Sequence, residues 1–184
     1  MNRSNPEDNG VILDPFCFVH LRVTEHFEEI LLCSGHRFAI DGYVLRHEGP
    51  LPAPEDGTSG VNRDIESAVS RGLLAILELE SDAEALTYLG MVSELEDGEA
   101  RACALALHRG LGLATDEAKV RRLMRLRAPK MLLPGTPELL RRWAERSRLQ
   151  RSDLRATLER IREAASYVPI GDDADSRWWR SMLR

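Results

Sequence analysis

The chain has 184 residues, of which 43% are apolar and 30% are charged, a composition typical of one globular domain and not of a disordered chain. No apolar run approaches the roughly 20 residues that a membrane span needs, and the polar start lacks the features of a secretory signal. We therefore expect a cytoplasmic protein without a membrane partner. Three widely spaced cysteines and five histidines without ligand spacing argue against a disulfide framework and a zinc site.

The net charge of −5 hides a strong asymmetry between the two halves of the chain. Residues 1–100 carry 20 acidic and 6 basic side chains, whereas residues 101–184 carry 10 acidic and 19 basic ones. A globally acidic protein can still bind nucleic acid if its positive charge lies on one face. Charge alone favours the simpler interpretation, a solvated basic surface balanced by an acidic half of the same fold.

The first half of the chain alternates short apolar runs with helical patterns. Val11-Ile12-Leu13 ends in Asp14, the pattern of a buried parallel strand with an acid at its carboxyl end. A helix is predicted to start at Pro15, and another spans 25–33 before a Gly stop signal. A second strand is predicted at 37–40 and a helix at 43–48. Residues 49–62 hold three prolines and three glycines, which indicates a loop or an insertion.

The second half begins with a predicted helix over 64–74. Residues 75–80 alternate apolar and acidic side chains, which favours a strand, although a helix start fits almost as well. A capping box at 81–84 predicts a helix to about Leu95, and an Ala-rich helix follows over 97–109. Residues 111–116 form a second apolar run that ends in an acid. Further elements are a basic helix at 117–127, a brief strand at 131–133, and helices near 137–147 and 152–166.

Strands separated by helices predict parallel pairing through right-handed crossovers, and such sheets bind ligands at the carboxyl ends of their strands. Two acids fall at that end and two more lie at helix ends, so we predict that four carboxylates converge: Asp14, Glu48, Glu99 and Asp116. Grouped carboxylates repel one another unless a cation neutralises them, and oxygen ligands select Mg²⁺ or Mn²⁺. Such a site is typical of metal-assisted phosphoryl chemistry.

Each acid also has a structural interpretation. Asp14 and Asp116 could cap the helices that follow them, Glu99 could stabilise the start of its own helix, and Glu48 could be a solvated acid. Taken singly, these interpretations are favoured; taken together, the acids favour the metal site. Neither a GxGxxG nor a GxxxxGK[ST] motif occurs, which argues against dinucleotide and P-loop functions.

Four segments in this order resemble a PIN domain: VILD, AIDGYVLRHE, LEDGEARACALALHRGLGLATDEAKVRRLM and LPGTPELLRRWAE. They are most similar to the branch related to the toxin ribonucleases of toxin–antitoxin modules. The resemblance covers about residues 11–166, with a poor match at 49–75. It implies a Rossmann-like, three-layer α/β/α sandwich with a central parallel sheet and a Mg²⁺- or Mn²⁺-dependent endoribonuclease. It also implies a small antitoxin partner and, by analogy, a homodimer.

Carried over position by position, the resemblance assigns the catalytic acids to Asp14, Glu48, Glu99 and Asp116. Three of them, Asp14, Glu99 and Asp116, would be direct or water-mediated metal ligands, and Glu48 would complete the site or orient the attacking water. Thr115 matches the small hydroxyl residue that often precedes the last acid. The basic helix that would hold the RNA backbone carries Lys119, Arg121 and Arg122.

Two positions depart from the family pattern, since Phe16 replaces a small polar residue and His20 stands where an Asn is common. They motivate an alternative, a catalytically degenerate PIN-fold module that binds RNA or a protein partner without cleavage. A third interpretation is that the chain is an interaction protein, encoded beside a partner, whose role is to be bound by that partner.

The expected organisation is a polar extension at 1–10, the domain at 11–166 with an insertion near 49–62, and a tail at 167–184. Trp178-Trp179 in the tail is expected to dock on the protein itself or in an oligomer contact, ahead of stacking on bases.

Overall fold

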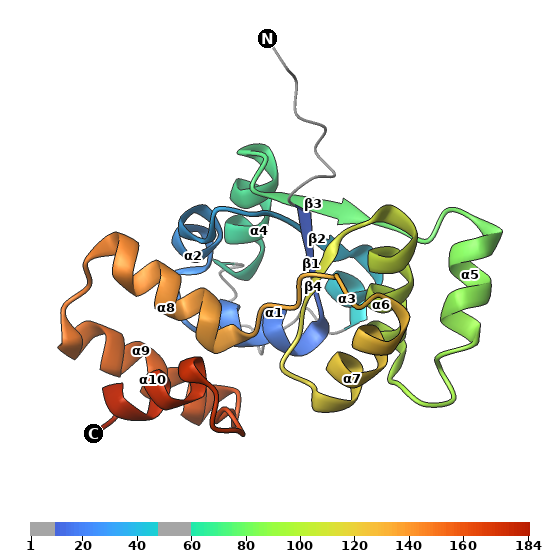
Figure 1. Cartoon of the computed structure of the whole chain (residues 1–184). Coiled ribbons are helices and arrows are strands. Elements are labelled where there is room, and N and C mark those ends of the chain that lie inside the picture. The colour runs from blue at the N-terminus through green and yellow to red at the C-terminus, as the bar shows by residue number, and fades with distance from the viewer. Residues whose placement is uncertain (1–9, 48–59) are drawn as a thin grey trace, which may run out of the picture.

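A sheet of four parallel strands forms the centre of the computed structural model, which describes residues 10–47 and 60–184 (Figure 1). The strands β1 (Gly10–Leu13), β2 (Arg37–Asp41), β3 (Leu74–Leu77) and β4 (Gly112–Ala114) pair in the order β3-β2-β1-β4. On β1, the central strand, Ile12 lies between Ala39 and Leu113. The predicted α/β class and parallel pairing are confirmed.

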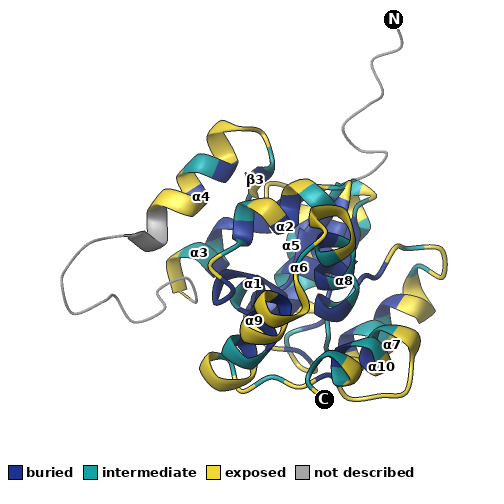
Figure 2. Ribbon diagram, turned by 90° about the vertical axis from the view of Figure 1, so that its left-hand side faces the viewer, coloured by how far each residue is buried: buried dark blue, intermediate teal, exposed yellow. Residues whose placement is uncertain are grey.

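Helices cover both faces of the sheet and give three layers. The alternation of β1 explains the layers, because Val11 and Leu13 enter one core cluster and Ile12 enters the other. The first cluster is closed by α1 (Pro15–Arg22), α2 (Phe27–Ser34), α3 (Gly42–His47), α4 (Gly60–Ser70), α8 (Thr136–Ser147), α9 (Arg151–Ala164) and α10 (Ala174–Met182). The second is closed by α5 (Asp82–Leu89), α6 (Asp97–Arg109) and α7 (Ala118–Arg127). The predicted α/β/α sandwich is therefore present, and Figure 2 shows its buried interior between exposed outer helix faces.

Capping chemistry sets several helix ends where the sequence predicted them. Asp14 caps α1, and its side chain accepts the amide hydrogen of Cys17 at 2.7 Å. Ser81 and Glu84 form the capping box that opens α5. The helices α2 and α6 end at Gly35 and Gly110, whose φ angles of 80° and 66° are left-handed.

Three helix boundaries differ from the prediction. Helix α4 ends at Ser70 and not at Leu74, because Gly72, with a φ angle of 68°, turns the chain into β3. Helix α4 begins at Gly60, so residues 60–62 are helical and not loop; the rest of the predicted loop and Glu48 lie outside the described residues. Helix α5 ends at Leu89 and does not reach Leu95, because Gly90 interrupts it and the following chain turns inward. This turn buries Met91 and Leu95 in the second core cluster.

The predicted last strand at 131–133 does not form a regular β-strand, but the segment runs alongside β4. The carbonyl oxygens of Leu132 and Pro134 accept the amide hydrogens of Leu113 and Thr115 at 2.9 and 3.0 Å. The segment therefore extends the sheet beyond β4 by two hydrogen bonds and leads into α8 at the carboxyl edge.

The C-terminal residues pack on the domain. Helix α10 lies against α8 and α9 (Figure 1), and Trp179 is fully buried in the first core cluster. Arg141 of α8 pairs with Asp175 of α10 at 3.1 Å. Within residues 10–47 and 60–184, no helix has the length and apolar character needed to cross a membrane.

Candidate acidic site at the carboxyl edge of the sheet

Three of the four predicted acids lie at the same edge of the sheet. Asp14 follows β1 and Asp116 follows β4, and these neighbouring parallel strands end side by side, where the Asp14 amide donates to the Ala114 carbonyl at 3.0 Å. Glu99 lies in the first turn of α6, which packs on β1 and β4. The charges of Asp116 and Glu99 both act on Asp14. The fourth acid, Glu48, lies outside the described residues.

Asp14 is fully buried and only half satisfied. Its Oδ1 accepts the Cys17 amide hydrogen, whereas its Oδ2 is buried and has no hydrogen-bond partner among the residues that the structure describes. Burial raises the pKa of Asp14 to about 8; the Thr115 hydroxyl and the Cys17 amide lower it, and the neighbouring acids raise it. Asp14 is thus a helix cap and, without a nearby cation, a carboxyl that is mostly protonated at neutral pH.

Asp116 carries the opposite protonation state. Its Oδ1 accepts the Thr136 amide hydrogen at 2.9 Å, and its Oδ2 lies 3.1 Å from His20 Nδ1 and 3.4 Å from the Cys17 thiol. Burial alone would raise the pKa of Asp116, but the bonds from His20 and Thr136 outweigh it and lower the pKa. Because an ionised carboxylate only accepts hydrogen bonds, the Nδ1 atom of His20 carries the proton between them.

Tyr167, between α9 and α10, covers the outer side of this pair. Its ring stacks on His20 with centroids 4.0 Å apart and meets the edge of Trp179 at 5.6 Å. Burial and the charge of Asp116, to which the phenol hydrogen bonds, raise the pKa of Tyr167. Tyr167, Cys17 and Thr136 were missed at the sequence level, since no local pattern brings them to Asp116.

Glu99 serves its own helix as well as the site. The side chain is 7% exposed, and its Oε2 accepts the amide hydrogen of Glu96 at 3.1 Å in a capping box. Burial raises the pKa of Glu99, while the Glu96 amide and the charge of Lys119 lower it. The predicted role in starting the helix is observed, and one oxygen, Oε1, is left outside that bond.

A further strand-end acid, Asp41, was not predicted as a site residue. It is the last residue of β2 and fully buried, and Arg101 of α6 binds both of its oxygens at 2.5 and 3.1 Å. The Arg101 guanidinium lies 5.1 Å from the Tyr43 ring and 5.7 Å from the Tyr88 ring. An arginine therefore neutralises this acid internally, in contrast to Asp14.

The predicted substrate-binding residues have different environments. Thr115 is fully buried, and its hydroxyl accepts the Glu117 amide hydrogen at 3.2 Å, so it acts inside the site. Arg121 donates to the Thr115 carbonyl at 2.8 Å, and Lys119 donates to the Glu94 carbonyl. Arg122 is exposed, with no ion pair or hydrogen bond among the residues that the structure describes.

The donor chemistry of the edge fits a hard cation. Carboxylate oxygens are the ligands that Mg²⁺ and Mn²⁺ prefer, and the unpartnered Oδ2 of Asp14 is a buried acceptor that a cation would satisfy. In the described part of the chain, however, no three His, Cys, Asp or Glu side chains are grouped closely enough to hold a metal ion. The oxygens of Asp116 are instead engaged by protein donors.

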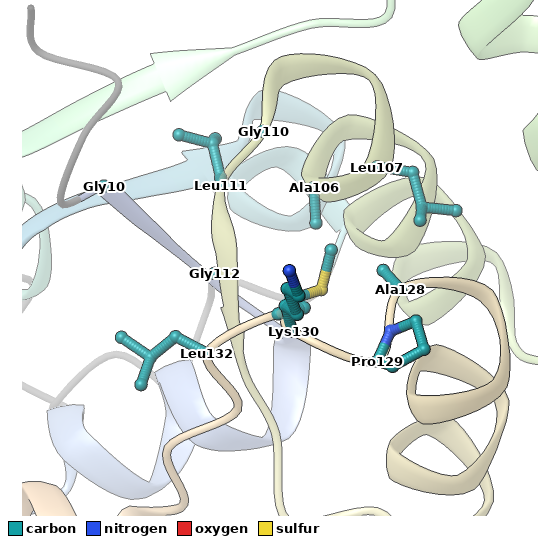
Figure 3. Close-up of a pocket in the computed structure, with 11 residues that line it drawn as sticks. Gly10, Ala106, Leu107, Gly110, Leu111, Gly112, Ala128, Pro129, Lys130 and Leu132 are labelled. Atoms are coloured by element: carbon teal, nitrogen blue, oxygen red, sulfur yellow. The ribbon is translucent and has the colours of Figure 1, made fainter.

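Two hollows lie at the opposite, amino edge of the sheet. The larger, about 540 Å³, lies between the ends of α6 and α7 and the start of β4, and apart from Lys130 its lining is glycine or apolar (Figure 3). The smaller, about 280 Å³, borders the starts of β2 and β3. Both contact Gly10 at the start of β1, so neither belongs to the acidic edge.

Asp14 predicts a pH dependence of stability. Its pKa rises from 3.8 to about 8 on folding, so between these values the folded chain holds a proton that the unfolded chain has released. The free energy of unfolding should therefore fall as pH rises through this window, by at most about 1.4 kcal/mol per pH unit, and level off above pH 8. Urea unfolding at a series of pH values, with a chelator present to remove metal ions, measures this pH dependence. Asp14→Asn keeps a good helix cap and should lose this component; identical pH profiles for both proteins would contradict the assignment.

Removing Arg101 from its pair with Asp41 is predicted to destabilise the folded protein. Arg101→Ala leaves a buried carboxylate without its partner and should lower the free energy of unfolding by about 3 kcal/mol or more. Arg46→Ala is the matched control, because Arg46 pairs with Glu78 at the surface and its loss should have little effect. Equal losses in the two variants, measured by urea unfolding, would show that Arg101 does not neutralise Asp41.

Comparison with known proteins leaves the family open. No family model, no curated protein and no solved structure matches this chain. The resemblance to PIN domains accordingly stays a prediction that rests on the quoted sequence segments. The fold and the acidic edge, in contrast, are observed in the structure of this chain.

Proposed function

We propose that this chain is a metal-dependent ribonuclease of the PIN type that hydrolyses RNA phosphodiesters. The observation that carries the proposal is Asp14, a fully buried carboxyl that has one oxygen without a hydrogen-bond partner among the described residues and that feels the charges of Asp116 and Glu99. Ionising several buried acids together is unfavourable unless a cation neutralises them. The acids also lie at the sheet edge where parallel α/β folds bind ligands.

Mg²⁺ or Mn²⁺ would be held by Asp14 and Asp116, with Glu99 as a direct or water-mediated ligand. Glu48 would complete the site or orient the attacking water, as the sequence resemblance implies. When bound, such an ion activates a water and stabilises negative charge on a phosphate. The protein's own contribution is orientation: the Cys17 amide fixes Asp14, and the Thr136 amide with His20 fixes Asp116.

Basic side chains beside the acids would bind the substrate backbone. Arg121 is held at the Thr115 carbonyl, next to Asp116, and its guanidinium is a donor fork suited to phosphate. Arg122 on the exposed side of α7 adds a second positive charge. These positions would keep an RNA phosphate close to the acidic edge.

A second candidate function is binding without cleavage, and the hydrogen bonds of Asp116 favour it. Both Asp116 oxygens already accept bonds from Thr136, His20 and Cys17, which a metal ion would have to compete with. Phe16 is 38% exposed where a small polar residue was expected. In this alternative the same edge recognises RNA or a protein partner. The small antitoxin and the homodimer stay predictions from the resemblance.

The ribonuclease proposal predicts that purified protein cleaves RNA with Mn²⁺ or Mg²⁺ and not with chelator. Asp14→Asn and Asp116→Asn should each reduce cleavage to the level of the buffer blank. Asp153→Asn, an exposed acid on α9, is the control and should cleave like the wild type. Cleavage that persists in both site variants would contradict the assignment of these acids. RNA binding by the wild type without any cleavage would favour the second candidate.

The raised pKa of Asp14 predicts that metal binding displaces a proton. Mn²⁺ needs an ionised ligand, so each ion should release about one proton at neutral pH. Calorimetry in buffers of different ionisation enthalpy measures the number released. Asp14→Asn should bind Mn²⁺ more weakly and release no proton from this position. Tight Mn²⁺ binding with the same proton release in Asp14→Asn would place the metal elsewhere.

A further inference from the structure

We propose that the outer face of α7 binds a single strand of RNA along its phosphate backbone and leads it to the acidic edge. This face, called here the α7 ridge, comprises Lys119, Arg122, Arg125, Leu126 and Lys130, the last just beyond the helix. The direction of the strand into the site rests on the proposed function. Binding by the ridge is a separate property that can be measured without cleavage.

Ion pairing distinguishes the ridge from the other basic helices. The arginines of α6 and α8–α10 mostly have carboxylate partners, as in the pairs Arg101–Asp41, Arg109–Glu84, Arg141–Asp175, Arg142–Glu138, Arg155–Glu159 and Arg180–Asp172. Helix α7 contains no acid in its sequence AKVRRLMRLR. Among the described residues, Arg122, Arg125 and Lys130 have neither an ion pair nor a hydrogen bond. The positive charge of residues 101–184 is therefore least compensated on α7.

The ridge has the geometry of a continuous row. Val120 and Met124 turn into the second core cluster, so the opposite side of α7 faces outward. Ridge residues recur every three or four positions, about one helical turn or 5.4 Å apart. Leu126 is 76% exposed within this row of cations. A strand laid on the ridge can thus meet successive phosphates and place a base against Leu126.

The ridge starts at the site. Helix α7 begins two residues after Asp116 and runs beside α6 (Figure 1). Arg121, on the side of α7 that turns toward the strand end, already bonds the Thr115 carbonyl. Lys130 lies beyond the other end of the helix, at the hollow of Figure 3. A strand on the ridge therefore has one end next to the three acids.

Surface shape favours RNA over an acidic protein as the occupant. A protein partner would need apolar contact at the centre of its interface, and the ridge offers Leu126 on a convex helix. A phosphate backbone needs only the row of cations, with an occasional apolar contact to a base. A flexible single strand can also bend from the ridge toward buried acids, which a regular duplex cannot do without opening.

The test is the affinity of a labelled, mixed-sequence RNA strand whose 2′-hydroxyls are methylated, so that it resists cleavage. Arg122→Ala/Arg125→Ala removes two ridge charges and keeps good helix formers. The matched control, Arg155→Ala/Arg162→Ala, removes two charges from exposed arginines of α9. Fluorescence anisotropy should show about tenfold weaker binding for the ridge variant. The slope of the logarithm of the binding constant against the logarithm of salt concentration should also be smaller in magnitude by about 1.4, which corresponds to two lost phosphate contacts on a single strand. The control should bind within about twofold of the wild type.

Equal affinity of the ridge variant and the wild type would overturn the inference. Displacement of the RNA by polyglutamate of the same charge would overturn RNA as the occupant, and equally tight binding of duplex RNA would overturn the single strand. Cleavage of RNA with an unchanged KM in the ridge variant would refute the ridge and leave the ribonuclease standing. Ridge-dependent binding without metal-dependent cleavage would keep the ridge and refute the ribonuclease.

Discussion

Asp14 stands at the point where the buried strand β1 gives way to α1, and two requirements act on it there. One carboxyl oxygen caps the helix through the Cys17 amide, which fixes the side chain in the protein interior. The other oxygen is buried as well and has no hydrogen-bond partner within residues 10–47 and 60–184. Burial of such an oxygen favours the protonated form or a bound cation, because a bare charge there is unfavourable. The acidic edge depends on this constraint.

The two strand-end acids respond to similar burial in opposite ways. Burial raises the pKa of Asp14 more than the bonds from Thr115 and Cys17 lower it, whereas at Asp116 the bonds from His20 and Thr136 outweigh burial and lower the pKa. One proton and one negative charge thus lie on neighbouring carboxyl groups, a division that enzymes use to separate acid and base roles. Tyr167 links Asp116 and His20 to the C-terminal segment, because its phenol bonds Asp116 and its ring stacks on His20.

The sequence predicted those parts of the molecule that follow local rules. An apolar run ending in an acid located β1 with Asp14 and β4 with Asp116. A capping box located the start of α5, and an Ala-rich pattern located α6. Contacts between distant residues were beyond such rules: the Cys17–Asp116 contact joins positions 99 apart, and Arg101–Asp41 joins positions 60 apart. The end of α5 was missed because burial of Met91 and Leu95 outweighed the helical pattern.

Charge shows the same division between local and tertiary information. Composition located the positive excess in residues 101–184, but not which arginines have partners. The structure pairs most arginines of α8–α10 and leaves α7 uncompensated among the residues it describes. Lys119, Arg121 and Arg122 were selected by resemblance, yet Arg121 bonds the strand end while Arg122 faces outward. Ion pairing, which composition does not reveal, therefore distinguishes α7 from the other basic helices.

The most direct test of the proposed metal site is a crystal structure of the protein with Mn²⁺, from crystals grown above pH 8. Anomalous scattering would locate the ion. We expect an ion beside Asp14 and Asp116, with the Asp14 Oδ2 atom among its ligands and the contacts of Asp116 with His20 and Tyr167 rearranged. An acidic edge that holds no ion, with the Asp116 contacts unchanged and Mn²⁺ bound only at exposed acids, would contradict a metal site at this edge.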